Sequence, residues 1–326
     1  MMQMNGVPER TQPQDSLRPW AFQLPKIDLH RHLEGSLRLA TLTELARAYA
    51  IPLPSYDVEG LRPYVQMVED VPDFHRFIEK FELLRRFYTS KEAIQRITRE
   101  AIADAAADNV VYLELRFNPL ALARIQGFAF RDVVAWVVEA TAEAERETGL
   151  RTCLILQIPR QESLEVANEI VDIAIDTFGR WVRGVDLAGD EVTYPPERFI
   201  EPFQRAYDAG LHITIHAGEA MGAESVRKAV LYLHPQRIGH GVRSVENSSV
   251  VRMLYEQGIT LEVCPTSNLH TGVVPTLAVH PLADLLRLRL QVTLNTDDPG
   301  VSATTLTDEV LVAVERIGVA PGAIYR

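Results

Sequence analysis

The chain has 326 residues, 47% of them hydrophobic, which is enough for a large buried core and a length at which (β/α)8 barrels occur as one domain. Lys plus Arg number 33 and Asp plus Glu 44, a formal net charge of −11 without a basic run, which argues against nucleic acid and anionic membranes as partners. Two cysteines, Cys153 and Cys264, and no apolar stretch long enough to span a membrane predict a cytoplasmic protein without a disulfide framework.

Residues 1–23 are polar and rich in Pro and Gln, with no apolar segment typical of a signal peptide, so we expect a mobile arm there. A single catalytic domain is expected over 24–326. Its first predicted strand, 26–32, carries His30 and His32. Side chains two residues apart on a strand point to the same side, so two imidazoles can bind one metal ion. The alternative is that one histidine is packed and the other solvated.

The segment between the first and second predicted strands is long and helical. Thr41 with Glu44, and later Thr89 with Glu92, have the spacing of capping boxes and predict two helix starts. An apolar stripe at spacings of 3, 4 and 3 residues predicts an amphipathic helix packed on the core, or less favourably a lid over a substrate: Phe74, Phe77, Phe81 and Leu84.

From residue 110 onward, short β-rich runs alternate with helical segments. The remaining predicted strands are 110–117, 152–158, 182–187, 212–216, 237–239, 259–263 and 291–295, and the predicted helices are 130–147, 162–178, 195–209, 223–233, 245–257, 280–289 and 304–317. Eight strands in such alternation favour an α/β fold, a closed (β/α)8 TIM-type barrel with extra helices between strands 1 and 2. An open doubly wound sheet is the alternative, and the chain has no glycine-rich nucleotide-binding motif at a strand end to support it.

Polar side chains gather at the ends of the predicted strands, where barrels of this type have their active sites. They are His30 and His32 after strand 1, Asp186 to Glu191 at strand 4, His216 and Glu219 at strand 5, His240 at strand 6, Cys264 to Asn268 at strand 7, and Asp297 and Asp298 at strand 8. The pattern therefore predicts one site that draws residues from most of the barrel.

The residue types suit a metal-assisted hydrolase. His30, His32, His216 and one carboxylate of the Asp297–Asp298 pair offer three nitrogens and an oxygen, a set that zinc accepts while keeping a position for water. Such a metal lowers the pKa of that water toward neutrality.

Three residues are left to move protons. A carboxyl group in a closed pocket has a raised pKa, so Glu219 can act as an acid that donates to a substrate nitrogen. His240 and Asp298 can position and deprotonate the water. The alternatives are a helix N-terminal carboxylate for Glu219 and a turn or N-cap role for Asp298, which precedes Pro299. The residues alone leave the substrate open.

Six strings in order resemble the adenosine deaminase family, across about residues 24 to 315. They are Asp28-Leu29-His30-Arg31-His32-Leu33-Glu34-Gly35, Asp186-Leu187-Ala188-Gly189-Asp190-Glu191, His216-Ala217-Gly218-Glu219, Arg237-Ile238-Gly239-His240-Gly241, Cys264-Pro265-Thr266-Ser267-Asn268 and Asn295-Thr296-Asp297-Asp298-Pro299. The resemblance implies a purine deaminase on a (β/α)8 barrel with one zinc ion per chain, and a small purine nucleoside or base as its binding partner.

By motif match, the resemblance implies His30, His32, His216 and Asp297 as zinc ligands. It also implies catalytic roles: Glu219 would protonate the ring nitrogen beside the carbon under attack, His240 would orient the attacking water and stabilise its charge, and Asp298 would hold that water and a purine nitrogen. The backbone of Gly189 would meet the far side of the purine, and His32 and Glu34 would also contact the substrate.

Glu34 departs from the family pattern. Many nucleoside-specific members carry Asp at this position, which reaches the sugar, whereas relatives that deaminate adenine or other 6-aminopurine derivatives often carry Glu. The expected reaction is hydrolytic deamination of adenosine and 2′-deoxyadenosine to inosine and 2′-deoxyinosine plus ammonia. The alternative is the same chemistry on adenine or on another 6-aminopurine derivative, such as an aminodeoxyfutalosine-type nucleoside.

Two further hypotheses stay open. One is a two-metal amidohydrolase, although the bridging Lys that such enzymes commonly place on strand 4 is missing here. The other is a catalytically inactive barrel that binds purines or a protein partner. Glu114 and Arg116 share a strand face and are interpreted as support for the site wall, pairing with Asp186 or Asp28. Five histidines without motif neighbours are predicted to be structural or solvent-facing, with His270 the candidate exception: His75, His212, His234, His270 and His280.

Overall fold

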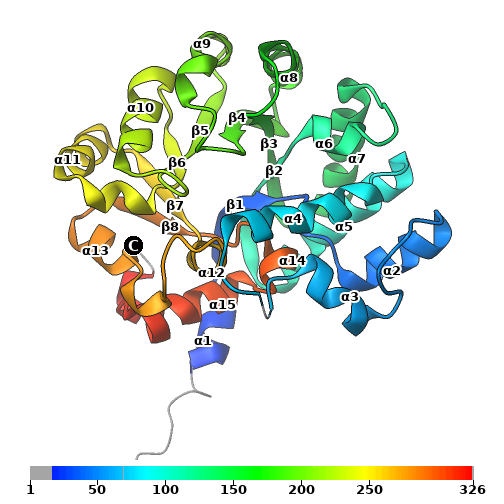
Figure 1. The fold of residues 1–326 in the computed structure, drawn as a ribbon, viewed down its shortest axis with the longest axis horizontal. Helices are drawn as coiled ribbons and strands as arrows, with labels where there is room; N and C mark the ends of the chain where they lie inside the picture. The colour runs from blue at the N-terminus through cyan, green and yellow to red at the C-terminus, as the bar shows by residue number, and fades with distance from the viewer. Residues whose placement is uncertain (1–16, 69, 325–326) are drawn as a thin grey trace, which may run out of the picture.

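Eight parallel strands form the centre of the molecule in a computed structural model, which describes residues 17–68 and 70–324. In chain order they are β1 (Lys26–His32), β2 (Val110–Phe117), β3 (Arg151–Pro159), β4 (Val182–Ala188), β5 (His212–Ala217), β6 (Arg237–His240), β7 (Thr260–Val263) and β8 (Gln291–Leu294). Each pairs with the next, and helices surround them (Figure 1). The predicted (β/α)8 barrel is confirmed, and every predicted strand bound lies within one residue of the observed one.

Closure of the barrel occurs at the residues that follow β8. The backbone N–H of Asp297 donates to the carbonyl oxygen of His30 at 2.8 Å, and the N–H of His32 donates to the carbonyl of Asp297 at 2.8 Å. The last strand thus meets β1 at its carboxyl end. Three predicted metal ligands are therefore tied together by their own backbone, which fixes where their side chains begin.

Four helices lie between β1 and β2, as predicted: α2 (Leu39–Ala48), α3 (Val58–Val65), α4 (Phe74–Leu84) and α5 (Lys91–Ala107). The later helices are α6 (Pro119–Ala123), α7 (Phe130–Thr148), α8 (Leu164–Thr177), α9 (Ile200–Asp208), α10 (Ala223–Leu233), α11 (Ser248–Gln257), α12 (Pro265–His270), α13 (Leu282–Arg287), α14 (Pro299–Ser302) and α15 (Leu306–Leu311). Within residues 17–68 and 70–324, no helix is both long and apolar enough to cross a bilayer.

Both predicted capping boxes are wrong in detail. Helix α2 begins at Leu39, two residues before Thr41, whose hydroxyl instead donates to Glu100 on α5. Helix α5 is capped by Ser90, which accepts from the N–H of Ala93, and not by Thr89. The N–H of Thr89 is bonded to the carbonyl oxygen of Phe87, so it is not available to the Glu92 side chain as a capping box requires, and the Thr89 hydroxyl has no partner among the described residues.

A mobile arm was expected over residues 1–23, and the structure contradicts this for residues 17–23. Residues 1–16 lie outside the described residues. Residues 17–23 form a helix, α1 (Leu17–Gln23), where a mobile arm was expected. Ala21 and Leu24 are buried against Val310 on α15. Arg18 forms an ion pair with Asp308 at 2.6 Å. This small apolar contact and the ion pair hold α1 against α15. The polar composition of residues 1–23 did not indicate this packing.

The apolar stripe on α4 has two uses. Phe77, Phe81 and Leu84 are buried, so the prediction of core packing is confirmed for them. Phe74 is half-exposed, and together with Phe77 and Phe81 it also lines the pocket at the carboxyl ends of the strands. One face of α4 therefore serves both as core and as a wall of the site.

Candidate active site

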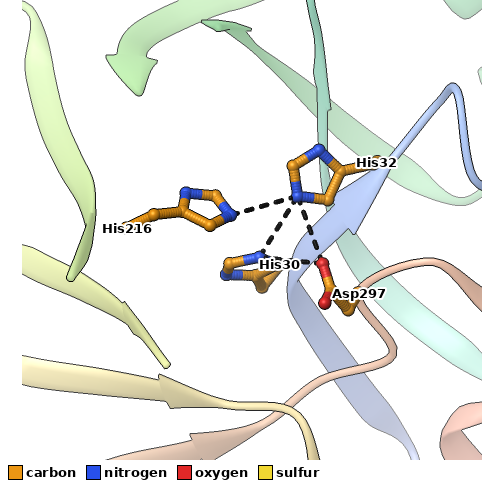
Figure 2. A group of neighbouring side chains, drawn as sticks. All are labelled: His30, His32, His216 and Asp297. Atoms are coloured by element: carbon orange, nitrogen blue, oxygen red, sulfur yellow. Dashed lines mark hydrogen bonds and ion pairs between the residues drawn. The ribbon is translucent and has the colours of Figure 1, made fainter. Parts of the chain in front are cut away.

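Four side chains converge at the carboxyl end of the barrel, from β1, β5 and the residues after β8 (Figure 2). His32 Nε2 lies 3.3 Å from His30 Nε2, 3.2 Å from His216 Nε2 and 3.2 Å from Asp297 Oδ1. His30 Nε2 lies 3.2 Å from the same Asp297 oxygen. All four side chains are buried. Ligands about 2.1 Å from one zinc ion in tetrahedral geometry would lie about 3.4 Å apart, so these spacings fit a single metal ion.

Each of the three imidazoles is oriented by a hydrogen bond at Nδ1, the ring nitrogen that points away from the other ligands. His30 Nδ1 is 2.9 Å from Glu262 Oε2 and His216 Nδ1 is 3.0 Å from Asp186 Oδ1. His32 Nδ1 lies 3.1 Å from Gln157 Oε1.

Because these oxygens only accept, each Nδ1 carries the proton and each Nε2 lone pair faces the centre. Burial lowers the pKa of His216 to about 3, even though Asp186 acts to raise it. The three Nε2 lone pairs and the Asp297 carboxylate thus form a donor set that fits a divalent cation.

Arg116 links two of those orienting carboxylates. Its guanidinium donates to Asp186 at 3.1 Å and to Glu262 at 2.8 Å, and it is fully buried. The predicted pairing of Arg116 with Asp186 is confirmed, whereas Glu114 pairs with Arg237. Glu262 and Gln157 were not predicted as site residues, although a charged residue such as Glu262 inside the short apolar strand β7 is a usable signal.

His240 and Asp297 share an unusual backbone conformation. Both have φ of +60°, a region that non-glycine residues seldom occupy and that costs energy. His240 Nε2 lies 3.5 Å from Glu219 Oε2 and 3.8 Å from Asp297 Oδ2. The strained backbone therefore holds an imidazole between the predicted acid and the metal-binding group.

The loop that carries Glu219 is held by Glu191. The Glu191 carboxylate accepts the backbone N–H groups of Gly218 at 2.7 Å, Glu219 at 3.2 Å and Met221 at 2.9 Å. Burial, then the charges of Asp297 and Glu191, raise the pKa of Glu219 to about 8. The Glu219 carboxyl group consequently keeps its proton near neutral pH and can donate it.

Asp298 lies against a residue that has no side chain. A Cβ added to Gly35 would lie 1.8 Å from Asp298 Oδ1, so the carboxyl group occupies space that any other residue at position 35 would fill. Asp298 Oδ1 has no hydrogen-bond partner among the described residues. Burial and the neighbouring charge of Asp297 raise the pKa of Asp298.

One pocket brings the remaining predicted residues together. Its lining includes His32, Glu34, Gly189, Glu219, His240 and Asp298. Glu34 Oε1 accepts the backbone N–H of Asn118 at 2.7 Å, while Oε2 has no partner within residues 17–68 and 70–324. Gly189 has φ of +102°. His270, the predicted exception, lies outside this lining, and its Nδ1 is 3.4 Å from the Ser302 hydroxyl.

A family model described as "Adenosine deaminase" matches residues 25–324. The chain belongs to the adenosine deaminase family. It is 38% identical to the adenosine deaminase of Edwardsiella ictaluri (strain 93-146), over 91% of this chain and 89% of that protein. Family membership and curated relatives of this name make the chain a hydrolytic deaminase.

Solved structures with the same fold include three informative neighbours. The adenine deaminase of Arthrobacter aurescens has a TM-score of 0.85 at 31% identity, covering 92% of this chain and 91% of that one. An amidohydrolase from Burkhoderia ambifaria "with bound Zn" has 0.83 at 28% identity, covering 93% and 83%. The N6-methyl-AMP deaminase of Arabidopsis thaliana has a TM-score of 0.82 at 31% sequence identity, covering 94% of this chain and 90% of that one. The spacing of His30, His32, His216 and Asp297 would allow metal binding, and the Burkholderia ambifaria neighbour is the one of these three whose description names a bound metal.

Proposed function

We propose that this protein uses one zinc ion per chain to deaminate adenosine and 2′-deoxyadenosine hydrolytically, giving inosine and 2′-deoxyinosine plus ammonia. The observation that carries the proposal is the meeting of four metal-binding side chains with the largely buried Glu219 carboxyl group at one pocket. Relatives named adenosine deaminase support adenosine as the substrate.

His30, His32, His216 and Asp297 would hold the zinc ion, which would supply the acidity that makes water nucleophilic near neutral pH. The side chains do the rest. Glu219 donates its proton to the ring nitrogen beside the carbon under attack, which makes that carbon electrophilic. Asp298 would accept the proton that the water loses, because its Oδ1 has no other hydrogen-bond partner among the described residues. The new C–O bond replaces the C–N bond: Asp298 would pass its proton to the amino group, which leaves as ammonia, and the proton of the new C–OH group would return to Glu219.

Residues that line the pocket would orient the substrate. The backbone of Gly189 would contact the far side of the purine, and its positive φ keeps that position free of a side chain. Glu34, with one carboxylate oxygen already bonded to Asn118, has the other available for a hydroxyl group of the sugar. His32 lines the same pocket and would contact the substrate as well as the metal.

The second candidate is deamination of adenine or another 6-aminopurine derivative. Glu34 favours it, because this longer carboxylate is frequent in relatives that act on the free base. The structural neighbour named adenine deaminase supports it as well.

A side-by-side assay of adenosine, 2′-deoxyadenosine and adenine, followed by ultraviolet absorbance, separates the two candidates. We expect rapid turnover of both nucleosides and little of adenine, and a Glu34→Asp variant that keeps the nucleoside preference. Preference for adenine in the wild type, reversed by Glu34→Asp, would establish the second candidate instead.

A further inference from the structure

A line of three buried polar side chains runs from the backbone at the start of α13 to His240. The N–H of Leu282 donates to His280 Nδ1 at 3.1 Å. His280 Nε2 lies 3.1 Å from Asn268 Oδ1, and Asn268 Nδ2 lies 3.1 Å from His240 Nδ1. His240, Asn268 and His280 are at most 4% exposed, so water does not compete for these contacts.

The backbone N–H at one end sets the direction of the whole line. An N–H group only donates, so His280 Nδ1 must be an acceptor, and a neutral imidazole then carries its proton on Nε2. That proton is donated to Asn268 Oδ1, which leaves the Asn268 amide nitrogen facing His240. Because an amide nitrogen also only donates, His240 Nδ1 is an acceptor, and the His240 proton lies on Nε2.

A reversed Asn268 amide does not fit. With its nitrogen toward His280, both ring nitrogens of His280 would have to accept, which requires an imidazolate anion in a buried site. Burial, and then the charge of His240, lower the pKa of His280 to about 4, so that ring is neutral at physiological pH. The backbone of Leu282 therefore fixes the Asn268 orientation as well as the His280 tautomer.

We propose that Asn268 and His280 are positioning residues that fix His240 as the Nε2–H tautomer. His240 Nε2 is the nitrogen 3.5 Å from Glu219 and is the one that faces the pocket. His240 thus offers a hydrogen bond to the reacting oxygen and does not remove its proton, which leaves Asp298 as the proton acceptor. This catalytic consequence rests on the proposed function, whereas the tautomer does not.

Nitrogen NMR of ¹⁵N-histidine-labelled, zinc-loaded protein tests the inference directly, with the His240 signals assigned by their loss in His240→Gln. We expect a protonated Nε2 and an unprotonated Nδ1 in the wild type. In His280→Leu the Asn268 amide loses the group that orients it, so we expect Nδ1 of His240 to become partly protonated. A wild-type His240 protonated on Nδ1 would overturn the inference.

Kinetics give a second reading. We expect kcat of His280→Leu to fall about 10- to 100-fold with little change in KM, the range found when a partner that orients a metal-bound histidine is removed. His280→Gln keeps one acceptor and one donor, so its kcat should be partly restored. His270→Leu changes a residue outside the His240–Asn268–His280 series, so its kcat should match that of the wild type. Unchanged kcat and an unchanged proton position in His280→Leu would refute the role, and if that variant does not fold, the wild-type spectrum still decides. A wild type that deaminates nothing would instead remove the proposed function.

Discussion

The carboxylate of Glu191 accepts the backbone N–H of Glu219 at 3.2 Å, which holds the buried Glu191 carboxyl group beside the Glu219 side chain, itself 13% exposed. The contact fixes the loop and also places a negative charge near the Glu219 side chain. Both that charge and burial favour the protonated form of Glu219. Glu191 thereby positions the proposed acid, and its charge adds to burial and to the charge of Asp297, the larger causes of the raised pKa of Glu219.

The pH dependence of turnover should reflect that pKa. Glu219 has a raised pKa of about 8, so it is protonated below this pH and loses its proton above it. The acid function, and with it kcat, should therefore fall as pH rises; a bound cation favours the ionised form and moves this fall to lower pH. The check is a kcat profile from pH 5 to 10. A rate that keeps rising through pH 9 would exclude Glu219 as the acid.

Glu219→Gln should separate metal binding from chemistry. Glu219 is not one of the four metal-binding residues, so zinc content should stay at the wild-type level while kcat falls at least about 10²-fold, the scale of lost general acid catalysis. Metal analysis and a steady-state assay of the same sample measure both. Near-normal turnover in this variant would refute the acid role.

Arg116→Gln should weaken metal binding without touching a ligand. Its guanidinium holds both carboxylates that orient His30 and His216, and partners of this kind are worth about 10- to 100-fold in metal affinity. Competition with a chromophoric chelator measures the zinc affinity. Arg237→Gln is the matched control, because Arg237 bonds Glu262 but not Asp186, and it should lose less. Equal affinities for both variants would contradict the bridging role of Arg116.

Gly35→Ala should displace Asp298. The added methyl group would lie 1.8 Å from Asp298 Oδ1, a distance that forces the carboxyl group or the backbone to move. We expect kcat to fall at least about 10-fold because proton-transfer groups need their geometry. Gly322→Ala, which meets nothing within 4 Å, is the control and should keep wild-type activity. Wild-type kcat in both variants would show that Asp298 has no strict position.

Strand periodicity predicted the barrel well, because a parallel strand buried on both faces leaves a short apolar run between turn residues. Helix starts were less predictable. Thr89 and Ser90 are adjacent hydroxyl residues, and the sequence does not show which one caps α5; in the structure it is Ser90, while the Thr89 hydroxyl has no partner among the described residues. The helix at 17–23 depends on Val310, which is almost 300 residues away in sequence. The predicted cytoplasmic location and the single catalytic domain over 24–326 stay predictions.

The motif residues of the candidate site were predictable because each lies beside its strand end. Asp186, which orients His216, was also among the strand-end residues, but the groups that orient His30 and His32 were not predicted. Glu262 and Gln157 act across the barrel on His30 and His32, and neither has a local motif. His280 was predicted to be structural or solvent-facing, yet it contacts Asn268, twelve residues earlier, and through it His240. Such contacts follow from the barrel closing, which sequence spacing does not express.

The central claim is a zinc-dependent deaminase with one metal ion, and metal titration of stripped protein tests it most directly. Protein freed of metal by a chelator is titrated with zinc while adenosine turnover is followed. We predict no turnover without metal and full activity at one zinc ion per chain. Full activity in the stripped protein, or activity that saturates only at two ions per chain, would contradict the account.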